Sequence, residues 1–381
     1  MKVFSILSLL SVSLVISVTH AQQSGVVTGA DTTFRVITTA VPFLTISPDA
    51  RNAAMGDVGV ATSPDANSAY WNPAKLVFID KAYGGAISYT PWLGKIINDM
   101  WISYLTGFYK ITREQAVALS MKYFDLGDIS FRGTGNEPLG DFNPRELALD
   151  LTYSRMLTEE FSVGLTGRYI YSNLTGAFPT GTDTRPINSA AVDLGVFYSK
   201  PMKGTKNSSL SLGALISNIG PKVSYTDDAN KNFIPTNLKI GGVYTTELDP
   251  FNSLSFALDL NKLLVPTVDK GQSVLSGMFS SFSDAPDGFS EELKEIILNM
   301  GIEYWYNNTF AGRMGYFLES RDKGNRQYLT LGVGFRNQKS FGIDVAYLVP
   351  TNGRENPLAE TIRFSLLFQV KAQDKEESVR D

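Results

Sequence analysis

From residue 82 onward, apolar and polar residues alternate along the chain with a period of two. Residues 115–125, for example, place Leu119 and Met121 on one face and Ser120 and Lys122 on the other. Such alternation is typical of half-buried β-strands. The pattern recurs in fourteen segments, which we predict to be strands: 82–90, 99–109, 115–125, 145–157, 161–171, 190–198, 208–218, 236–246, 252–260, 296–306, 309–318, 326–336, 340–348 and 360–370.

The two faces of these predicted strands differ in charge. One face is almost purely apolar, whereas the other carries charged residues: Lys122, Asp150, Arg168, Asp193, Lys239, Asp259, Glu303, Arg313, Asp344 and Arg363. The strands are close to the roughly 9–11 residues of a tilted membrane strand, and longer than the roughly five or six usual in globular domains. We expect these charged side chains to form an ion-paired lattice around a plug in the lumen, because buried charges need partners; a conductive path is the alternative.

The connections between the predicted strands alternate in length. The short ones are 110–114, 157–160, 200–207, 246–251, 306–309 and 336–340, and the long ones are 126–144, 172–188, 218–235, 261–293 and 348–360. Short periplasmic turns, long extracellular loops and an even strand number are typical of outer-membrane barrels. We therefore predict an all-β fold, a 14-stranded antiparallel transmembrane β-barrel of the outer membrane over residues 82–371; a soluble β protein is the alternative.

The stretch Phe43–Leu76 lacks this alternation and is rich in Ala, Asn, Asp and Gly. Three helix-start signals follow one another in it: Ser47-Pro48-Asp49, Ser63-Pro64-Asp65 and Asn72-Pro73-Ala74. In each, a Ser or Asn that can cap a helix precedes a proline suited to the first turn, and Gly56 can end the first helix. An exposed N-terminal arm is one interpretation. Fourteen strands, however, enclose more volume than their side chains fill, so we expect a small helical plug within residues 22–81.

The two ends of the chain carry further signals. Residues 1–21 have the pattern of a signal peptide, because Lys2 precedes the apolar run Val3–Val18 and Thr19-His20-Ala21 suits cleavage. We therefore expect export to the periplasm, and a charged periplasmic tail over residues 372–381. After the predicted signal peptide no run of 18 apolar residues occurs, so the sequence predicts no transmembrane helix.

Composition narrows the possible chemistry. Cysteine is absent, and the sole histidine is His20, which lies within the predicted signal peptide. The mature chain therefore lacks zinc sites built on His or Cys, disulfides, and Ser-His-Asp or Cys-His nucleophiles. We expect no catalytic residues, no metal site and no cofactor, although carboxylate or lysine chemistry is still open to an enzyme. The formal net charge of −4 argues against nucleic acid as a partner.

The Phe43–Leu76 block, the segment Tyr83–Thr90 and the sequence RELALDLTYSRML at 145–157 carry a family resemblance. A 14-stranded barrel with Asn-Pro-Ala in an N-terminal hatch resembles the FadL-type outer-membrane channels for hydrophobic molecules. Within that group, essentially the whole mature chain is more similar to the PorV family of the type IX secretion system of Bacteroidetes. Asn-Pro-Ala alone is a weak signal, whereas the 34-residue block is specific.

That resemblance implies a non-enzymatic role in protein export. A PorV-like protein would bind a large outer-membrane translocon barrel and receive the C-terminal signal domains of secreted cargo. It would then pass the cargo to a sortase-like attachment complex at the cell surface, beside the bilayer and its lipopolysaccharide. The alternative is a FadL-like channel that takes up hydrophobic small molecules.

The longest predicted loop, 261–293, has an unusually apolar composition for a segment that faces water. Its candidate contact residues are Leu275, Met278, Phe279, Phe282 and Phe289. Exposed apolar patches often mark partner sites, and Met and Phe are enriched in interface cores. We predict that this loop docks with the translocon or with cargo; a lid folded over the barrel mouth is the alternative.

Overall fold

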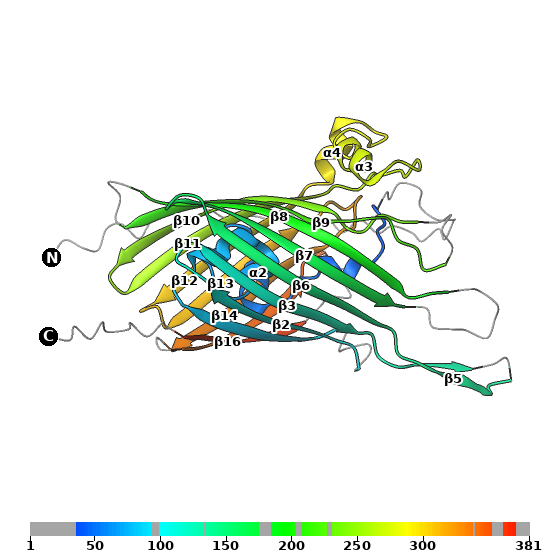
Figure 1. The fold of residues 1–381 in the computed structure, drawn as a ribbon, viewed down its shortest axis with the longest axis horizontal. Helices are drawn as coiled ribbons and strands as arrows, with labels where there is room; N and C mark the ends of the chain where they lie inside the picture. Colours follow the sequence, from blue (N-terminus) through cyan, green and yellow to red (C-terminus); the bar gives the residue numbers. More distant parts are fainter. Residues whose placement is uncertain are drawn as a thin grey trace, which may run out of the picture. The chain divides into compact units, whose positions relative to one another are not determined.

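The computed structural model describes residues 36–92, 99–132, 135–174, 184–202, 207–226, 231–337, 340–352 and 361–370. Within these ranges, fourteen antiparallel strands close into one barrel, in which β1 pairs with β16 (Figure 1). The barrel strands are β1 (Tyr83–Pro91), β2 (Trp101–Lys110), β3 (Gln115–Asp125), β6 (Arg145–Met156), β7 (Phe161–Asn173), β8 (Ile187–Met202), β9 (Ser208–Ile219), β10 (Asn237–Asp249), β11 (Asn252–Leu263), β12 (Ile297–Tyr306), β13 (Phe310–Leu318), β14 (Gln327–Asn337), β15 (Phe341–Pro350) and β16 (Ile362–Val370). The predicted fold class is confirmed, and each predicted strand overlaps one of these strands.

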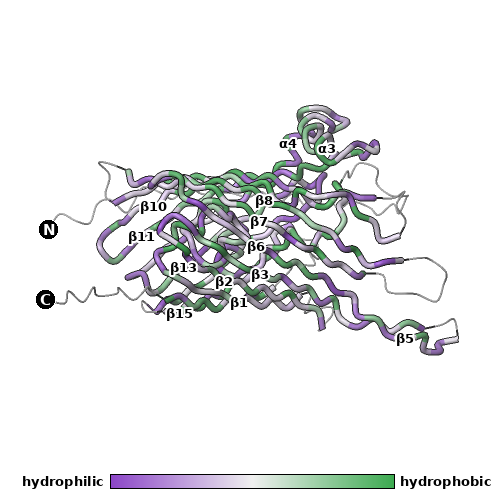
Figure 2. The backbone as a smooth tube through the Cα atoms, in the orientation of Figure 1, coloured by the Kyte–Doolittle hydropathy of each residue, from purple (hydrophilic) through white to green (hydrophobic). Residues whose placement is uncertain are grey.

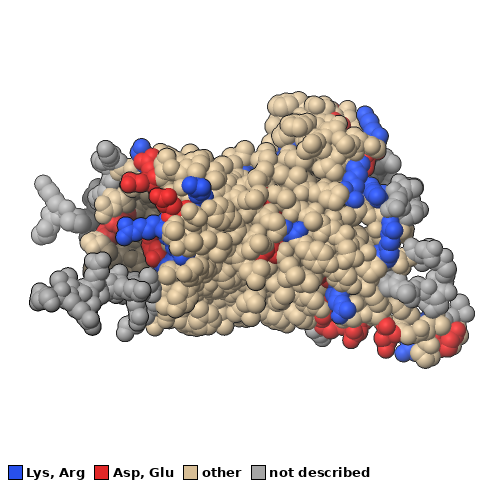
Figure 3. Space-filling model, in the orientation of Figure 1, with Lys and Arg blue, Asp and Glu red and all other residues tan. Residues whose placement is uncertain are grey.

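The two faces of the barrel wall are sorted as the alternation predicted. Asp259 and Asp344 on the inner face are fully buried, whereas Leu119 and Leu151 on the outer face are each 65% exposed. Hydrophobic and hydrophilic positions alternate along the strands (Figure 2), and charged residues gather toward the two ends of the barrel (Figure 3). Because lipid cannot hydrogen-bond to polar groups, an apolar outer wall with a polar lumen suits a bilayer.

Short turns and long connections lie at opposite ends of the barrel. Tyr83 at the start of β1 pairs with Val370 at the end of β16 and with Tyr109 near the end of β2. Both ends of the barrel sequence therefore lie beside the β2–β3 turn. We call this the short-turn end; in outer-membrane barrels such an end faces the periplasm. The opposite, long-loop end carries the helices α3 (Val274–Ser280) and α4 (Phe289–Lys294).

The long connection 126–144 contains a hairpin that the sequence pattern did not predict. Its strands β4 (Ile129–Arg132) and β5 (Pro138–Phe142) form a separate two-stranded sheet, in which Ile129 pairs with Phe142. The hairpin therefore prolongs the β3–β6 pair beyond the barrel rim. In the described residues, no helix has the length and apolar character needed to span a membrane.

The N-terminal segment lies inside the ring of strands (Figure 1). Most residues from 40 to 79 are buried, and we call this range the plug. It contains two 3-10 helices and two short α-helices: η1 (Pro42–Thr45), α1 (Ala50–Ala53), α2 (Ser68–Trp71) and η2 (Pro73–Phe78). The predicted small helical plug is thus part of the fold. The predicted signal peptide (1–21), residues 22–35 and the predicted charged tail (372–381) lie outside the described residues.

Two of the three predicted helix starts are wrong in detail. Helix α1 has Asp49, not Ser47, as its N-cap, because the Asp49 carboxylate accepts the N–H of Asn52. No helix begins at Ser63-Pro64-Asp65; α2 begins at Ser68, after a turn in which Asp65 accepts the N–H of Asn67. The third start is correct, since Asn72 caps η2 and Pro73 occupies its first turn, although η2 is a 3-10 helix. Gly56 follows α1 at a φ of 71°, as expected for a helix end.

Candidate functional site

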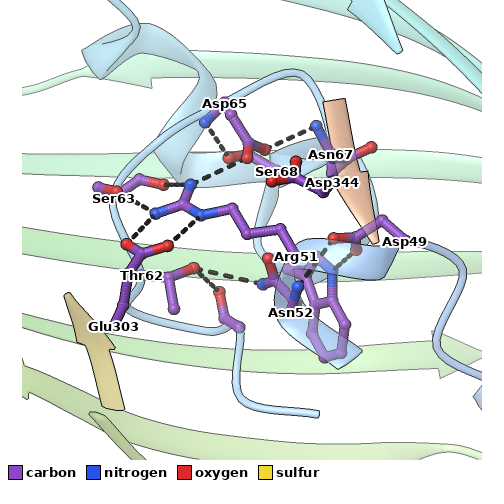
Figure 4. Close-up of polar contacts among 12 residues, drawn as sticks. Asp49, Arg51, Asn52, Thr62, Ser63, Asp65, Asn67, Ser68, Glu303 and Asp344 are labelled. Atoms are coloured by element: carbon purple, nitrogen blue, oxygen red, sulfur yellow. Dashed lines mark hydrogen bonds and ion pairs between the residues drawn. The ribbon is translucent and has the colours of Figure 1, made fainter. Parts of the chain in front are cut away.

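Arg51 joins two parts of the plug to the barrel wall (Figure 4). Its guanidinium donates to both carboxylate oxygens of Glu303 on β12, at 3.0 and 2.8 Å, and to Asp65 at 2.9 Å. It also donates to the backbone carbonyl of Ser63 at 3.0 Å. All three charged side chains are at least nine-tenths buried. Because a buried guanidinium is stable only when its donors are satisfied, this geometry fixes Ser63 and Asp65 against β12.

Asp49 connects the first helix to the second. One of its carboxylate oxygens accepts the Asn52 N–H at 3.0 Å, and the other accepts the Trp71 indole N–H at 2.5 Å. Burial, and secondarily the charge of Asp65, raises the pKa of Asp49 from 3.8 to about 6. The preceding residues are also fixed, because Pro48 is buried and the Ser47 carbonyl accepts from Arg363 of β16 at 2.7 Å.

The Asn72-Pro73-Ala74 motif fixes the other side of the plug. The Asn72 amide donates to the carbonyls of Val60 and Val196, at 3.0 and 2.9 Å, while its oxygen accepts the Ala74 N–H. The Ala74 carbonyl accepts from the hydroxyls of Ser154 and Ser162, on β6 and β7. This close approach needs small wall residues: a Cβ on Gly195 would lie 2.3 Å from the Asn72 side-chain oxygen. The motif therefore binds the plug to three neighbouring strands.

Two further plug contacts were not predicted. Asp259 on β11 accepts the N–H groups of Gly59 and Val60, at 2.7 and 3.0 Å. Lys75 donates to the Gly59 carbonyl at 2.7 Å and to Thr62 at 2.9 Å, and burial lowers its pKa to about 8. The charge of Asp259 was visible in the strand pattern. Its partners Gly59 and Val60 could not be predicted, because closure of the barrel around the plug brings them to Asp259.

The charged inner faces form ion pairs, as the lattice interpretation predicted. Arg168 binds Asp150 and Asp193, at 2.7 and 3.0 Å. Arg313 on β13 binds Glu303 on β12 at 2.6 Å and Asp344 on β15 at 2.7 Å. Both arginines therefore have buried carboxylate partners on other strands of the wall. In the described residues, no group of three His, Cys, Asp or Glu side chains could hold a metal ion.

The long-loop end carries a second candidate site, the segment 264–296, which we call the α3–α4 loop. Four of its five predicted contact residues are exposed: Leu275, Phe279, Phe282 and Phe289. Phe279 and Phe289 are 77% and 76% exposed. Met278 was predicted wrongly as a contact residue: it is only 8% exposed, because it lies on the inner side of α3, beside Gly277 and its neighbour Phe233.

Buried ion pairs hold the α3–α4 loop to the barrel. Lys262 at the end of β11 binds Glu292 and Glu295, at 3.1 and 2.5 Å. Lys323, in the β13–β14 connection, binds Glu291 and again Glu295, at 2.7 and 2.9 Å. In Figure 1 the two helices stand outside the outline of the barrel. The loop is thus anchored beside the rim, an arrangement that does not fit a lid over the mouth.

The sequence matches one family over residues 29–270, more than half of the chain. That family is described as "Type IX secretion system protein PorV". The chain belongs to the PorV family. This confirms the predicted family and makes the protein an outer-membrane component of type IX secretion. No curated protein matches the chain.

Solved structures similar to this chain include a hydrocarbon channel, a toluene transporter and a FadL homologue. A TodX monoaromatic hydrocarbon channel mutant (deltaS2S3) is 12% identical, with 85% of this chain and 98% of that one covered at a TM-score of 0.52. The Ralstonia pickettii toluene transporter TbuX is 13% identical, with 86% and 99% covered at a TM-score of 0.49. A Pseudomonas aeruginosa FadL homologue is also 13% identical, with 85% and 97% covered at a TM-score of 0.40. The similarity to the TodX channel shows a shared fold; at this identity it does not assign a ligand.

Proposed function

We propose that this PorV-family chain is a non-enzymatic receptor that moves within the outer membrane. In this proposal the α3–α4 loop binds a large outer-membrane translocon barrel and the C-terminal signal domains of exported cargo. The receptor then passes cargo to a sortase-like attachment complex at the surface, beside the lipopolysaccharide of the outer leaflet. The protein itself would reach the periplasm through the predicted signal peptide.

The observation that carries this proposal is the exposed apolar surface of an anchored loop. Phe279 and Phe289 expose most of their rings, yet the segment that carries them is anchored to the barrel at α4 by the Lys262 and Lys323 ion pairs. Aromatic side chains on a rigid element lose little conformational entropy when a partner covers them. Large exposed apolar patches mark protein contacts, so this surface fits a protein partner.

The competing function, uptake of hydrophobic molecules, needs apolar space in the lumen. Such a region exists between β2, β3 and β7, where Ile102, Phe124 and Ile170 are buried in one cluster. The same cluster contains Phe43 and Leu44 of η1, so the chain fills this region with its own residues. The plug is also bonded to strands around the barrel, which opposes its movement. These observations favour export over uptake.

The proposal is tested with the double variant Phe279→Ser, Phe289→Ser. If each ring is a binding hot spot, a loss of about 2 kcal/mol or more lowers affinity at least roughly tenfold. Export of a reporter that carries the signal domain, and co-purification of the translocon, should both fall by that order. The folded barrel should be unchanged, because neither ring is buried.

The matched control is Ile129→Ser, Leu139→Ser on the β4–β5 hairpin. These residues are also exposed apolar groups at the long-loop end, at 42% and 44%. This control should export and co-purify as the wild type does. Wild-type export and co-purification in the Phe279→Ser, Phe289→Ser variant would refute the proposal. An equal loss in both variants would show that the α3–α4 loop has no specific role in binding.

A further inference from the structure

A cavity of about 640 Å³ opens in the lumen at the short-turn end. Its inner boundary is the plug, at Arg51 and Ser63-Pro64-Asp65, and its walls come from β10 to β12 and β14 to β16. On the other side of the lumen, η2 contacts β6, β7 and β8 and fills the corresponding space. The cavity is of the size of ligand sites, which occupy about 300–1,000 Å³.

The charged residues of this cavity are largely neutralised within the protein. Arg51 is bound by Asp65 and Glu303, and Arg336 is bound by Asp344 at 2.5 Å. The lining also contains the adjacent pair Asp80 and Lys81, one of each sign. A site for phosphate or another strongly charged ligand would instead present an excess of one charge.

Most of the remaining lining residues carry uncharged hydrogen-bonding groups or aromatic rings. Thr245, Ser253 and Ser255 lie on the neighbouring strands β10 and β11, and Trp305 and Phe341 supply aromatic surface. Hydroxyl groups both donate and accept hydrogen bonds, which the N–H and C=O groups of a peptide require. The Thr245 and Ser255 hydroxyls bond to each other at 2.9 Å, and an acyl chain would leave their remaining hydrogen-bonding capacity and the Ser253 hydroxyl unsatisfied at a cost in free energy. The lining is therefore matched to a polar, uncharged ligand.

We propose that the short-turn cavity binds a short, extended and uncharged polar segment of a polypeptide that enters from the periplasm. The plug closes the inner end, so the segment docks without crossing the barrel. A protein-export component has polypeptides as its partners, which favours a peptide over a saccharide of similar polarity. The site lies at the opposite end of the barrel from the α3–α4 loop, so either proposal can fail without the other.

The absence of cysteine from the chain permits a direct test. Ser253→Cys places a thiol in the cavity wall, and Glu159→Cys places one on an exposed short turn outside it. The full-length protein in lipid nanodiscs is labelled with a membrane-impermeant maleimide. The ligand is the blocked pentapeptide acetyl-Ser-Asn-Gly-Ser-Asn-amide. At about ten times its Kd, the peptide should slow labelling of Ser253→Cys roughly tenfold and leave that of Glu159→Cys unchanged.

A second variant fills the cavity with a large side chain and so tests whether the peptide binds there. Ser340→Trp, at an exposed position of the lining, should abolish the protection of Ser253→Cys by peptide without unfolding the barrel. Maltotetraose and laurate serve as saccharide and acyl-chain competitors, and neither should protect. Unprotected labelling with the peptide, protection that survives Ser340→Trp, or equal protection by maltotetraose or laurate would each overturn the proposal.

Discussion

The plug and the α3–α4 loop place their polar and apolar groups in opposite ways. The plug buries charged and amide side chains, and Arg51, Asp49 and Asn72 each bind more than one partner. The α3–α4 loop buries its charges too, but it leaves Phe279 and Phe289 exposed to solvent. Both are anchored by buried ion pairs. They differ in that the loop exposes apolar rings to solvent, whereas the plug does not expose its large apolar side chains.

That difference separates a structural element from a contact element. Buried polar groups of the plug that bond to the wall, such as those of Arg51 and Asn72, would lose hydrogen bonds if the plug moved, so the barrel sets the position of the plug. The exposed rings of the loop make no contacts that the free protein depends on, and burying them against a partner is favourable in free energy. Removal of plug contacts should therefore cost stability, whereas removal of loop rings should cost binding.

The largest stability effect is expected from Arg51→Met. The substitution leaves Asp65 buried without its cation and Glu303 with Arg313 as its remaining cation, and breaking a buried ion pair in this way costs about 3–5 kcal/mol. The free energy of unfolding, measured by denaturant titration of the barrel in detergent with tryptophan fluorescence as the signal, should fall by that amount. Trp71 reports on the plug directly, because its indole is bonded to Asp49.

The control for this variant is Lys200→Met at the short-turn end. Lys200 pairs with Glu160 at 3.2 Å, but both side chains are well exposed and solvent screens the pair, so its loss should change the free energy of unfolding far less than Arg51→Met does. The comparison sets a buried cation with two carboxylate partners against an exposed cation with one. Equal unfolding free energies for the two variants would show that the Arg51 contacts do not stabilise the plug.

The second effect concerns pH and Asp49. Its pKa in the folded protein is raised to about 6, from 3.8 for the free side chain, by burial first and by Asp65 second. A raised carboxyl pKa favours the protonated form, so the stability contributed by Asp49 is present at low pH and is lost as pH rises through about 6. A shift of about two units corresponds to about 3 kcal/mol.

Asp49→Asn removes this titration and serves as the reference at each pH. The unfolding free energy of the wild type minus that of Asp49→Asn should fall by about 3 kcal/mol between pH 3 and pH 7. Taking the difference cancels the titration of all other groups that the two proteins share. A difference that stays constant with pH would show that Asp49 does not carry a raised pKa in the plug.

The barrel was predictable because its signal is local and repeated. Alternation at residues such as Leu119 and Ser120 assigns both a strand and its face, and connection lengths then orient the strands. The plug was predictable from volume, since a barrel of this size needs material in its lumen. Neither inference required knowledge of the contacts between residues that are far apart in the sequence.

The errors arose where several local options compete. Ser47 and Asp49 can both cap a helix, and Asp49 prevails because its carboxylate also reaches Trp71 across the plug. Met278 and Phe279 are adjacent apolar residues, and only the helical geometry of α3 decides which one faces inward. The contact of Asp259 with Gly59 joins residues 200 positions apart, a distance at which sequence pattern carries no signal.

The smallest effect is expected from Asn72→Ala combined with Pro73→Ala. The double variant removes the η2 cap and the bonds to Val60 and Val196, at a cost of about 1–2 kcal/mol. Arg51 and Asp259 still hold the rest of the plug, so export should continue. Passage of small solutes across the outer membrane, measured with a reporter in the periplasm, should rise. Pro64→Ala, at a half-buried plug proline, is the matched control and should stay impermeable. Unchanged permeability and stability in the double variant would mean that this motif does not seal the lumen, and the plug would then be held by its charged contacts alone.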